Sequence, residues 1–576
     1  MTMSSFVPYS PDSDFPIQNI PFGIISTASN PTPRPATAIG DYAVDLSVLA
    51  NAGLFTGPLL APHAKTVFSE TTLNAFMAMG RPVWREARQT LQSLLAATGD
   101  AGAALRDNHQ LRDQALTPLS DIQSHMPASI GDYTDFYASK EHATNVGTMF
   151  RGKENALMPN WVHIPVGYHG RASSVVISGT PIRRPCGLVL NPTTKVPEFS
   201  ASRKMDIELE VAFFVGVGNH LGDRIDVSQA DDHIFGMVLM NDWSSRDIQQ
   251  FEYVPLGPFL GKNFGTTISP WIVTLDALEE ARVDQPAQEP TPSEYLLDSP
   301  QCKNAYDVNL EVQFKHLLTN PCIYAAQQRG EQESTLVCKS NLKYMYWTFK
   351  QQLAHHTING CNMKTGDLCG SGTISGPTTD SLGSLLELTY NGSQPLTLKN
   401  DVKRSFVEDG DEIIISGSAH AGSVDGKAVR LGFGKSTGVV LPAAFGTHKP
   451  DPSFDQSRAH GTRYLMLARM DALWTARKAI QIGILVDTHP FSVDHCILCN
   501  QQLLSTSIAH LVVDCEQVTD HRIQSGLVPA IQKSRLRLLG RSTRSGCGEC
   551  IYLAPRWSLK WRSRSGPALV GRDCGA

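Results

Sequence analysis

Apolar and acidic residues alternate between residues 205 and 215, and the run then becomes wholly apolar. On a strand, alternate side chains share a face, so Asp206, Glu208 and Glu210 would point the same way. Buried carboxylates are costly unless a partner compensates their charge, and Mg²⁺ or Ca²⁺ would do so through oxygen ligands. The pattern predicts either a metal-binding strand or a solvated edge face.

Other patterns predict a chain that is mainly β with added helices. Residues 36–46 have the alternation and turn residues of a hairpin. Residues 81–97 carry an apolar stripe at helical spacing, and Gly99 follows as a stop signal. Residues 385–388 are mostly apolar, and we predict that they begin a strand series that lasts until about residue 441.

Length and composition indicate a soluble protein with several domains. A chain of 576 residues exceeds one hydrophobic core, so we expect roughly two to four domains. No stretch approaches the roughly 18 apolar residues of a membrane span, and the N-terminus does not resemble a secretory signal. Single cysteines spread along most of the chain are typical of reduced thiols. We therefore expect a cytoplasmic protein without a membrane segment.

Charge divides the chain into two unlike parts. Residues 1–450 contain 34 Lys and Arg against 45 Asp and Glu, whereas residues 451–576 contain 16 against 10. Within the second part, residues 521–576 hold 11 basic and 2 acidic side chains. This break predicts that the C-terminal segment is a different kind of sequence from the rest.

Candidate chemistry begins near residue 131, where polar residues, tyrosines and glycines are interleaved. His142 could act as a general base, although a single histidine is more often structural. Lys262 lies in a glycine-rich loop that could bind an anion or oxyanion. Carboxylates from three segments would form an oxygen cage for a divalent cation if the fold joins them, and otherwise each is a surface or capping residue. These carboxylates are Asp135, Glu208, Glu210 and Asp242.

Blocks of sequence in the same order as these candidates resemble the fumarylacetoacetate hydrolase family. The similarity extends from about residue 15 to about residue 441. It implies a small N-terminal SH3-like β-barrel domain in residues 1–127, a mixed β-roll catalytic domain in residues 128–446, and a homodimer. The blocks are residues 132–137, 141–145, 149–155, 165–171, 206–214, 240–249, 253–267 and 371–377.

The resemblance implies a metal-dependent hydrolase of tyrosine and phenylalanine catabolism. Its substrate would be 4-fumarylacetoacetate, a diketo dicarboxylate cleaved at a carbon–carbon bond to fumarate and acetoacetate, with Ca²⁺ and/or Mg²⁺ as cofactor. Other acylpyruvate hydrolases and decarboxylases of the superfamily are the alternative, against which the long ordered match argues.

The resemblance also implies roles for individual residues. Asp206 shares the strand face of the acidic run but matches no ligand. The implied metal-site residues are Asp135, Glu208, Glu210, Asp242, Lys262 and Thr266. The implied catalytic residues are His142, Glu387, Arg246, Gln249 and Lys262. The implied substrate contacts are Tyr137, Arg151, Tyr168, Gln249, Tyr253 and Thr373.

Residues 447–576 form a basic, cysteine-containing extension beyond this resemblance. Their Cys496, Cys499, His510 and Cys515 have a spacing that could hold Zn²⁺, and the segment resembles the zinc-knuckle region of retrotransposon reverse transcriptases. Such a tail, if folded, could bind nucleic acid. The favoured interpretation is a poorly structured transposon remnant or an erroneous gene-model extension, because the segment ends in a Ser- and Arg-rich stretch and has no sustained hydrophobic periodicity.

Overall fold

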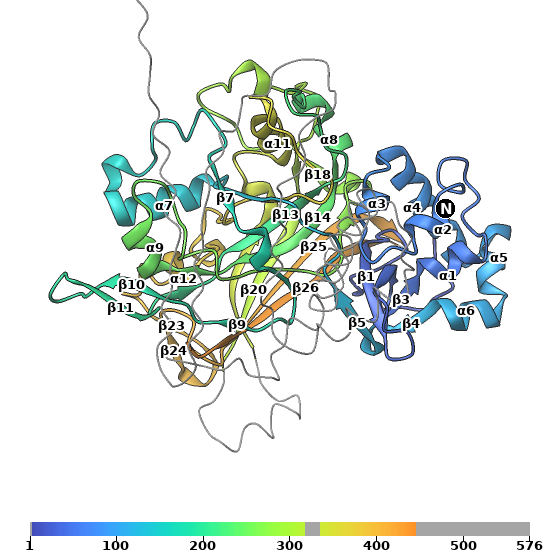
Figure 1. Ribbon diagram of the computed structural model, residues 1–576, viewed down its shortest axis with the longest axis horizontal. Coiled ribbons are helices and arrows are strands. Elements are labelled where there is room, and N and C mark those ends of the chain that lie inside the picture. Colours follow the sequence, from blue (N-terminus) through green and yellow to red (C-terminus); the bar gives the residue numbers. More distant parts are fainter. Residues whose placement is uncertain (1–2, 317–333, 425, 445–576) are drawn as a thin grey trace, which may run out of the picture. The chain divides into compact units, whose positions relative to one another are not determined.

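The computed structural model describes residues 3–316, 334–424 and 426–444 (Figure 1). Strands predominate and helices lie between them, so this part of the chain is mainly β with some helices. No helix among the described residues is both long and apolar enough to cross a membrane.

The N-terminal region is a sheet in the order β4-β3-β2-β1-β5, with helices around it (blue in Figure 1). The predicted hairpin is confirmed, because β2 and β3 pair in antiparallel fashion around Gly40, whose φ of 55° suits glycine. The strands are β1 (Phe22–Thr27), β2 (Arg34–Ile39), β3 (Tyr42–Asp45), β4 (Leu116–Pro118) and β5 (Ile122–His125). The helices are α1 (Leu46–Asn51), α2 (Ala64–Val67), α3 (Asn74–Met77), α4 (Arg81–Leu95), α5 (Asp100–Arg106) and α6 (His109–Ala115).

The long helix predicted from its apolar stripe is α4, and it ends two residues before the predicted limit. Its stripe, which includes Trp84 and Leu91, is buried. The Trp84 ring meets Phe235 of the central sheet edge to face, with ring centroids 5.1 Å apart. This contact joins the N-terminal helices to the sheet that carries the acidic residues.

A second sheet follows the order β7-β6-β22-β13-β14-β16-β8, and β17 pairs with β14. Its central strands β13 and β14 are buried along their whole length, which explains their nearly continuous apolar sequence. The strands are β6 (Tyr133–Phe136), β7 (Gly167–Gly170), β8 (Val175–Ile177), β13 (Leu209–Val215), β14 (Ile234–Asp242), β16 (Thr266–Ile268), β17 (Val273–Thr274) and β22 (Leu368–Gly370).

A third sheet has the order β21-β20-β25-β26-β9, and short two-stranded ribbons complete the β structure. This sheet is built from β9 (Ile182–Arg183), β20 (Val308–Lys315), β21 (Thr335–Asn341), β25 (Glu412–Val424) and β26 (Lys427–Leu441). The ribbons pair β10 (Cys186–Leu190) with β11 (Pro197–Ala201), β12 (Met205–Asp206) with β15 (Ser244–Ser245), β18 (Arg282–Val283) with β19 (Ala305–Tyr306), and β23 (Leu396–Thr397) with β24 (Lys403–Arg404). The remaining helices are α7 (Lys140–Arg151), α8 (Ala230–His233), α9 (Arg246–Glu252), α11 (Phe349–Thr357) and α12 (Leu385–Leu388).

The prediction that residues 385–388 begin a strand was wrong, because they form the short helix α12. Ser384 caps this helix by accepting a hydrogen bond from the Glu387 N–H. The Asp206 carboxylate accepts two further bonds, from the N–H groups of Leu385 and Leu386. A four-residue apolar run has too little periodicity to distinguish helix from strand, and here the long-range acceptor stabilises the helix.

Candidate active site

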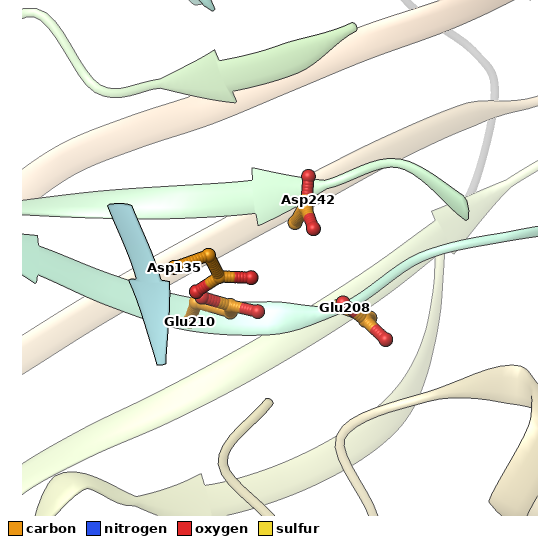
Figure 2. A group of neighbouring side chains, drawn as sticks. All are labelled: Asp135, Glu208, Glu210 and Asp242. Carbon is orange, nitrogen blue, oxygen red and sulfur yellow. The ribbon is translucent and has the colours of Figure 1, made fainter. Parts of the chain in front are cut away.

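The four predicted carboxylates meet at one end of the central strands (Figure 2). One oxygen from each lies within 4.8 Å of the others, and all four residues are buried. Sheet pairing explains the arrangement, because β13 lies between β14 and β22, and β6 runs parallel beside β22. The contributing residues are Asp135 on β6, Glu208 just before β13, Glu210 within β13 and Asp242 at the end of β14.

The three acidic residues of the alternating stretch do not share one environment. The chain leaves strand geometry between β12 and β13, so the predicted single strand is two pieces. Glu208 and Glu210 join the carboxylate cluster, whereas Asp206 is not part of it. Asp206 instead forms an ion pair with Arg246, with 2.7 Å between Oδ2 and Nε.

On one side of the cluster, Asp135 and Glu210 form no ion pair with any residue that the structure describes. Burial, followed by the repulsion of neighbouring carboxylates, raises the pKa of Asp135 and of Glu210 well above the usual range. Glu210 Oε1 has no hydrogen-bond partner among the described residues, although it is buried. An orphaned carboxylate oxygen beside three other carboxylates fits a hard divalent cation with oxygen ligands.

Gly370, the last residue of β22, and Gly372, just beyond it, shape this side of the cluster. The Gly372 N–H donates to Glu210 Oε2 at 3.0 Å and to Asp135 Oδ1 at 3.2 Å. A Cβ on Gly370 would lie 2.6 Å from Asp135 Oδ1 and 3.1 Å from Glu210 Oε2. Glycine at this position therefore leaves room for both carboxylates to face the same space.

Two buried cations cover the other side. Lys262 forms ion pairs with Glu208 and with Asp242, the second with 2.6 Å between Nζ and Oδ2. Arg246 Nη1 lies 2.8 Å from Glu208 Oε1. Burial acts to raise the pKa of Glu208, but the charges of Lys262 and Arg246 outweigh it and lower this pKa to about 2. Glu208 is thus ionised at neutral pH and holds both cations.

Asp242 is fixed by hydroxyl groups as well as by Lys262. The Thr266 hydroxyl donates to Asp242 Oδ1 at 2.9 Å, and the Tyr168 hydroxyl donates to Asp242 Oδ2 at 3.0 Å. The structure therefore brings Lys262, Thr266 and Tyr168 together around one carboxylate of the cluster.

His142 and Glu387 form a buried pair, with 2.6 Å between Nδ1 and Oε2. Asn145, Ser375 and Ser384 also donate to the Glu387 carboxylate, at 2.8 to 3.0 Å. Burial acts to raise the pKa of Glu387, but the adjacent His142 and these hydrogen bonds outweigh it and lower the pKa. An ionised Glu387 holds the imidazole with Nδ1 protonated, which leaves Nε2 as a proton acceptor.

Three of the residues predicted to contact the substrate are Tyr137, Gln249 and Thr373. The Tyr137 ring packs edge to face against the His142 imidazole, with centroids 5.3 Å apart. Gln249 Oε1 accepts a hydrogen bond from Arg246 Nη1 at 3.3 Å. Thr373 is buried, and its hydroxyl has no partner in the described part of the chain, so it is available to a ligand.

The structure does not bring Arg151 and Tyr253 into this hydrogen-bonded group. Arg151 donates to the carbonyl oxygens of Asn155 and Ala156, and Tyr253 lies at the surface with 36% of its area exposed. A cavity of about 600 Å³ opens on the Glu387 side of the pair, between α7 and residues 376–379.

Sequence reasoning assigned no role to the three residues that surround Glu387. Asn145 and Ser375 lie within blocks that carry the family resemblance, whereas Ser384 has only the signal of a helix cap before an apolar run. The proposed tail zinc residues Cys496, Cys499, His510 and Cys515 lie outside the described residues.

Comparisons with known proteins identify the family of this chain. The family described as "Fumarylacetoacetase N-terminal" matches residues 18–127, and "Fumarylacetoacetate (FAA) hydrolase C-terminal" matches residues 132–429. The fumarylacetoacetase of Rattus norvegicus is 54% identical over 439 residues, which cover 76% of this chain and 99% of that protein. The human fumarylacetoacetase is 53% identical over 440 residues, with the same two coverages.

The similarity extends to plants and does not depend on the C-terminal extension. The fumarylacetoacetase of Arabidopsis thaliana is 52% identical over 441 residues, which cover 77% of this chain and 99% of that protein. The chain therefore belongs to the fumarylacetoacetate hydrolase family.

Proposed function

We propose that this chain is a fumarylacetoacetase that hydrolyses 4-fumarylacetoacetate to fumarate and acetoacetate, the last step of tyrosine and phenylalanine catabolism. The observation that carries the proposal is the buried carboxylate cage beside the His142–Glu387 pair, in a chain 54% identical to a fumarylacetoacetase. Hydrolysis of a carbon–carbon bond in a 1,3-diketone requires both parts: a base that activates water and a charged centre that stabilises an enolate.

The proton chemistry begins at His142. Its Nε2 takes a proton from water, and the resulting hydroxide oxygen bonds to a substrate carbonyl carbon. Glu387 stabilises the imidazolium and keeps the ring in orientation. The carbon–carbon bond then breaks, its electron pair passes to the acetoacetate enolate, and the proton taken by His142 returns to that carbon. Such base catalysis typically contributes about 10²–10⁴-fold.

Lys262, Arg246 and Gln249 face the negative charge that develops at the attacked carbonyl. Lys262 and Arg246 are held in place by Glu208, so they require little reorganisation during the reaction. Removal of one donor of this kind costs roughly 3 kcal/mol in transition-state stabilisation.

The carboxylate cage would hold Ca²⁺ and/or Mg²⁺ through Asp135, Glu208, Glu210 and Asp242. When bound, the cation supplies Lewis-acid stabilisation of negative charge on the diketone oxygens. Lys262 and Thr266 complete the surroundings of this site through Asp242.

The remaining proposed contacts suit a substrate with two carboxylates. Arg151 provides the positive charge, and Tyr137, Tyr168 and Tyr253 provide hydroxyl donors. Thr373 contributes a hydroxyl that has no hydrogen-bond partner within the described part of the chain.

We further propose a division into residues 1–127, 128–446 and 447–576, in which the N-terminal sheet forms a small SH3-like barrel before the β-roll. The protein would act in the cytoplasm as a homodimer. Light scattering of the purified chain tests the dimer, and a monomer at micromolar concentration would refute it.

The decisive experiment measures hydrolysis of fumarylacetoacetate by chains that end at residues 446 and 576, with and without a chelator. We expect both chains to release fumarate and acetoacetate in equal amounts, to lose activity with chelator, and to recover it with Mg²⁺ or Ca²⁺. His142→Ala should abolish turnover while the metal content stays unchanged. Absence of turnover by the metal-loaded wild-type chains would refute the proposed function.

A further inference from the structure

Asp206 is fully buried and accepts hydrogen bonds from several directions. Its Oδ1 accepts from the N–H groups of Ile207 and Leu385, both at 2.8 Å. Its Oδ2 accepts from the Leu386 N–H at 2.9 Å and from Arg246 Nε at 2.7 Å. One carboxylate thus joins β12, α12 and α9.

Both partner elements carry groups of the active site. Arg246 is the first residue of α9, and its Nη1 reaches Glu208 of the carboxylate cluster. The helix α12 carries Glu387, which lies two residues after Leu385 and holds His142. Asp206 is therefore the shared anchor of the oxyanion-facing arginine and of the carboxylate that orients the base.

The anchor has to come from outside α12, because a helix of four residues is too short to be stable alone. The Ser384 cap satisfies only the Glu387 N–H. The Asp206 carboxylate satisfies the two N–H groups before it, and these would otherwise be buried without acceptors.

We propose that Asp206 is a positioning residue for catalysis, which fixes Arg246 and the Glu387-bearing helix α12 in the relative placement that the reaction needs. This proposal deepens the proposed hydrolase function and rests on it. A purely structural role would lower stability alone, whereas a positioning role lowers kcat in a protein that remains folded.

Asp206→Asn is the direct test. An asparagine has the same shape, but its amide nitrogen donates, so at least one of the N–H or guanidinium donors loses its acceptor. We expect kcat to fall about 100-fold, as for a misplacement of about 1 Å, with KM within about threefold of the wild type. Metal content should remain unchanged.

Asp411→Asn is the matched control. Asp411 is also buried, also pairs with an arginine (Arg404, 2.9 Å) and also accepts a backbone N–H, from Glu408. Neither Arg404 nor Glu408 is a proposed site residue. We expect this variant to lose stability comparably while kcat stays within about twofold of the wild type.

A spectroscopic readout separates positioning from general damage. The 2.6 Å contact between His142 and Glu387 should give a downfield imidazole proton resonance, which His142→Ala assigns by its loss. We expect Asp206→Asn to shift or remove this resonance and Asp411→Asn to leave it unchanged. This measurement needs no substrate, so it tests the positioning of the pair even if the wild-type chain fails to hydrolyse fumarylacetoacetate.

A second pair of variants decides the matter if Asp206→Asn does not fold. Leu385→Pro removes the N–H that Asp206 accepts, and proline is tolerated at the first position of a helix after an extended residue such as Ser384. Leu385→Ala loses the same buried side chain but keeps the N–H. We expect kcat to be about tenfold lower for the proline variant than for the alanine variant.

The proposal is overturned by any of three results. These are a folded Asp206→Asn protein with kcat within about threefold of the wild type, a lowered kcat with an unchanged His142 resonance, or equal kcat values for the two Leu385 variants.

Discussion

Replacement of Glu387 by glutamine tests the base most directly, because the side chain keeps its shape and loses its charge. Glu387 Oε2 accepts from His142 at 2.6 Å, from Ser384 at 2.8 Å and from Ser375 at 2.9 Å, and Oε1 accepts from Asn145 at 2.9 Å. The amide nitrogen of a glutamine would face a hydrogen-bond donor whether it replaced Oε1 or Oε2, because both oxygens accept hydrogen bonds. The His142 ring then loses its charged acceptor, and its protonated Nδ1 is no longer favoured.

The size of the effect follows from these contacts. Loss of an oriented general base removes about 10²–10⁴ in rate, so we expect kcat to fall about 10³-fold, or about 4 kcal/mol. The buried donor left without an acceptor costs about 1–3 kcal/mol of unfolding free energy.

The stability difference should depend on pH with a definite sign. The folded pKa of Glu387 lies below its unfolded value, so the ionised side chain stabilises the fold fully above a pH of about 4.3. This contribution disappears as the pH falls through the folded pKa. The difference in unfolding free energy between wild type and Glu387→Gln should therefore shrink in acid.

Steady-state hydrolysis of fumarylacetoacetate and urea unfolding at several pH values measure both effects. Glu141→Gln is the matched control, because this carboxylate lies one residue from His142 on α7 and its Oε2 has no hydrogen-bond partner among the described residues. A folded, metal-loaded Glu387→Gln protein with kcat within about threefold of wild type would refute the proposed role.

Lys262→Met should lower kcat by about 10²–10³-fold in steady-state assays, because it removes a buried donor that faces the developing negative charge; a loss below about tenfold would contradict this. In protein treated with a chelator, burial and then carboxylate repulsion raise the pKa values of Asp135 and Glu210. As the pH rises past about 4.3, these groups lose their protons in the unfolded state but keep them in the folded state. Calorimetry should therefore show the chelated protein losing stability as the pH rises toward 7, and added metal should cancel that loss. Leu91→Ala should lower the urea-unfolding free energy by about 2–5 kcal/mol and leave kcat unchanged, since Leu91 is fully buried on α4 away from the proposed catalytic residues.

The local sequence pattern was sufficient to predict some of the secondary-structure elements. The stripe of α4 and the hairpin of β2 and β3 were predicted, because a helical repeat of apolar residues and a turn between two adjacent strands are both visible in the local sequence. Residues 385–388 were predicted wrongly, because their helix depends on acceptors from Asp206, which is about 180 residues earlier. No pattern within a short apolar run contains that information.

The difference between local and long-range information also explains which site residues the sequence alone could predict. Alternation selected Glu208 and Glu210, which both join the carboxylate cluster. It equally selected Asp206, which instead pairs with Arg246 where β12 ends. The role of Glu387 followed only from the family resemblance. The hydroxyl and amide donors around Glu387 were missed, since isolated serines and asparagines are common in loops and caps.

Charge explains why the carboxylate cluster could hold a cation. Arg246 is shared between Asp206 and Glu208, and Lys262 between Glu208 and Asp242. Asp135 and Glu210 have no ion pair among the described residues, and the fold raises the pKa of both. Several buried carboxylates strongly destabilise a fold unless positive charges compensate them. Removal of one partner of a buried ion pair leaves the other charge uncompensated and destabilises the fold further. A divalent cation would supply two positive charges, so the residues that weaken the empty fold are the ones that would bind such a cation.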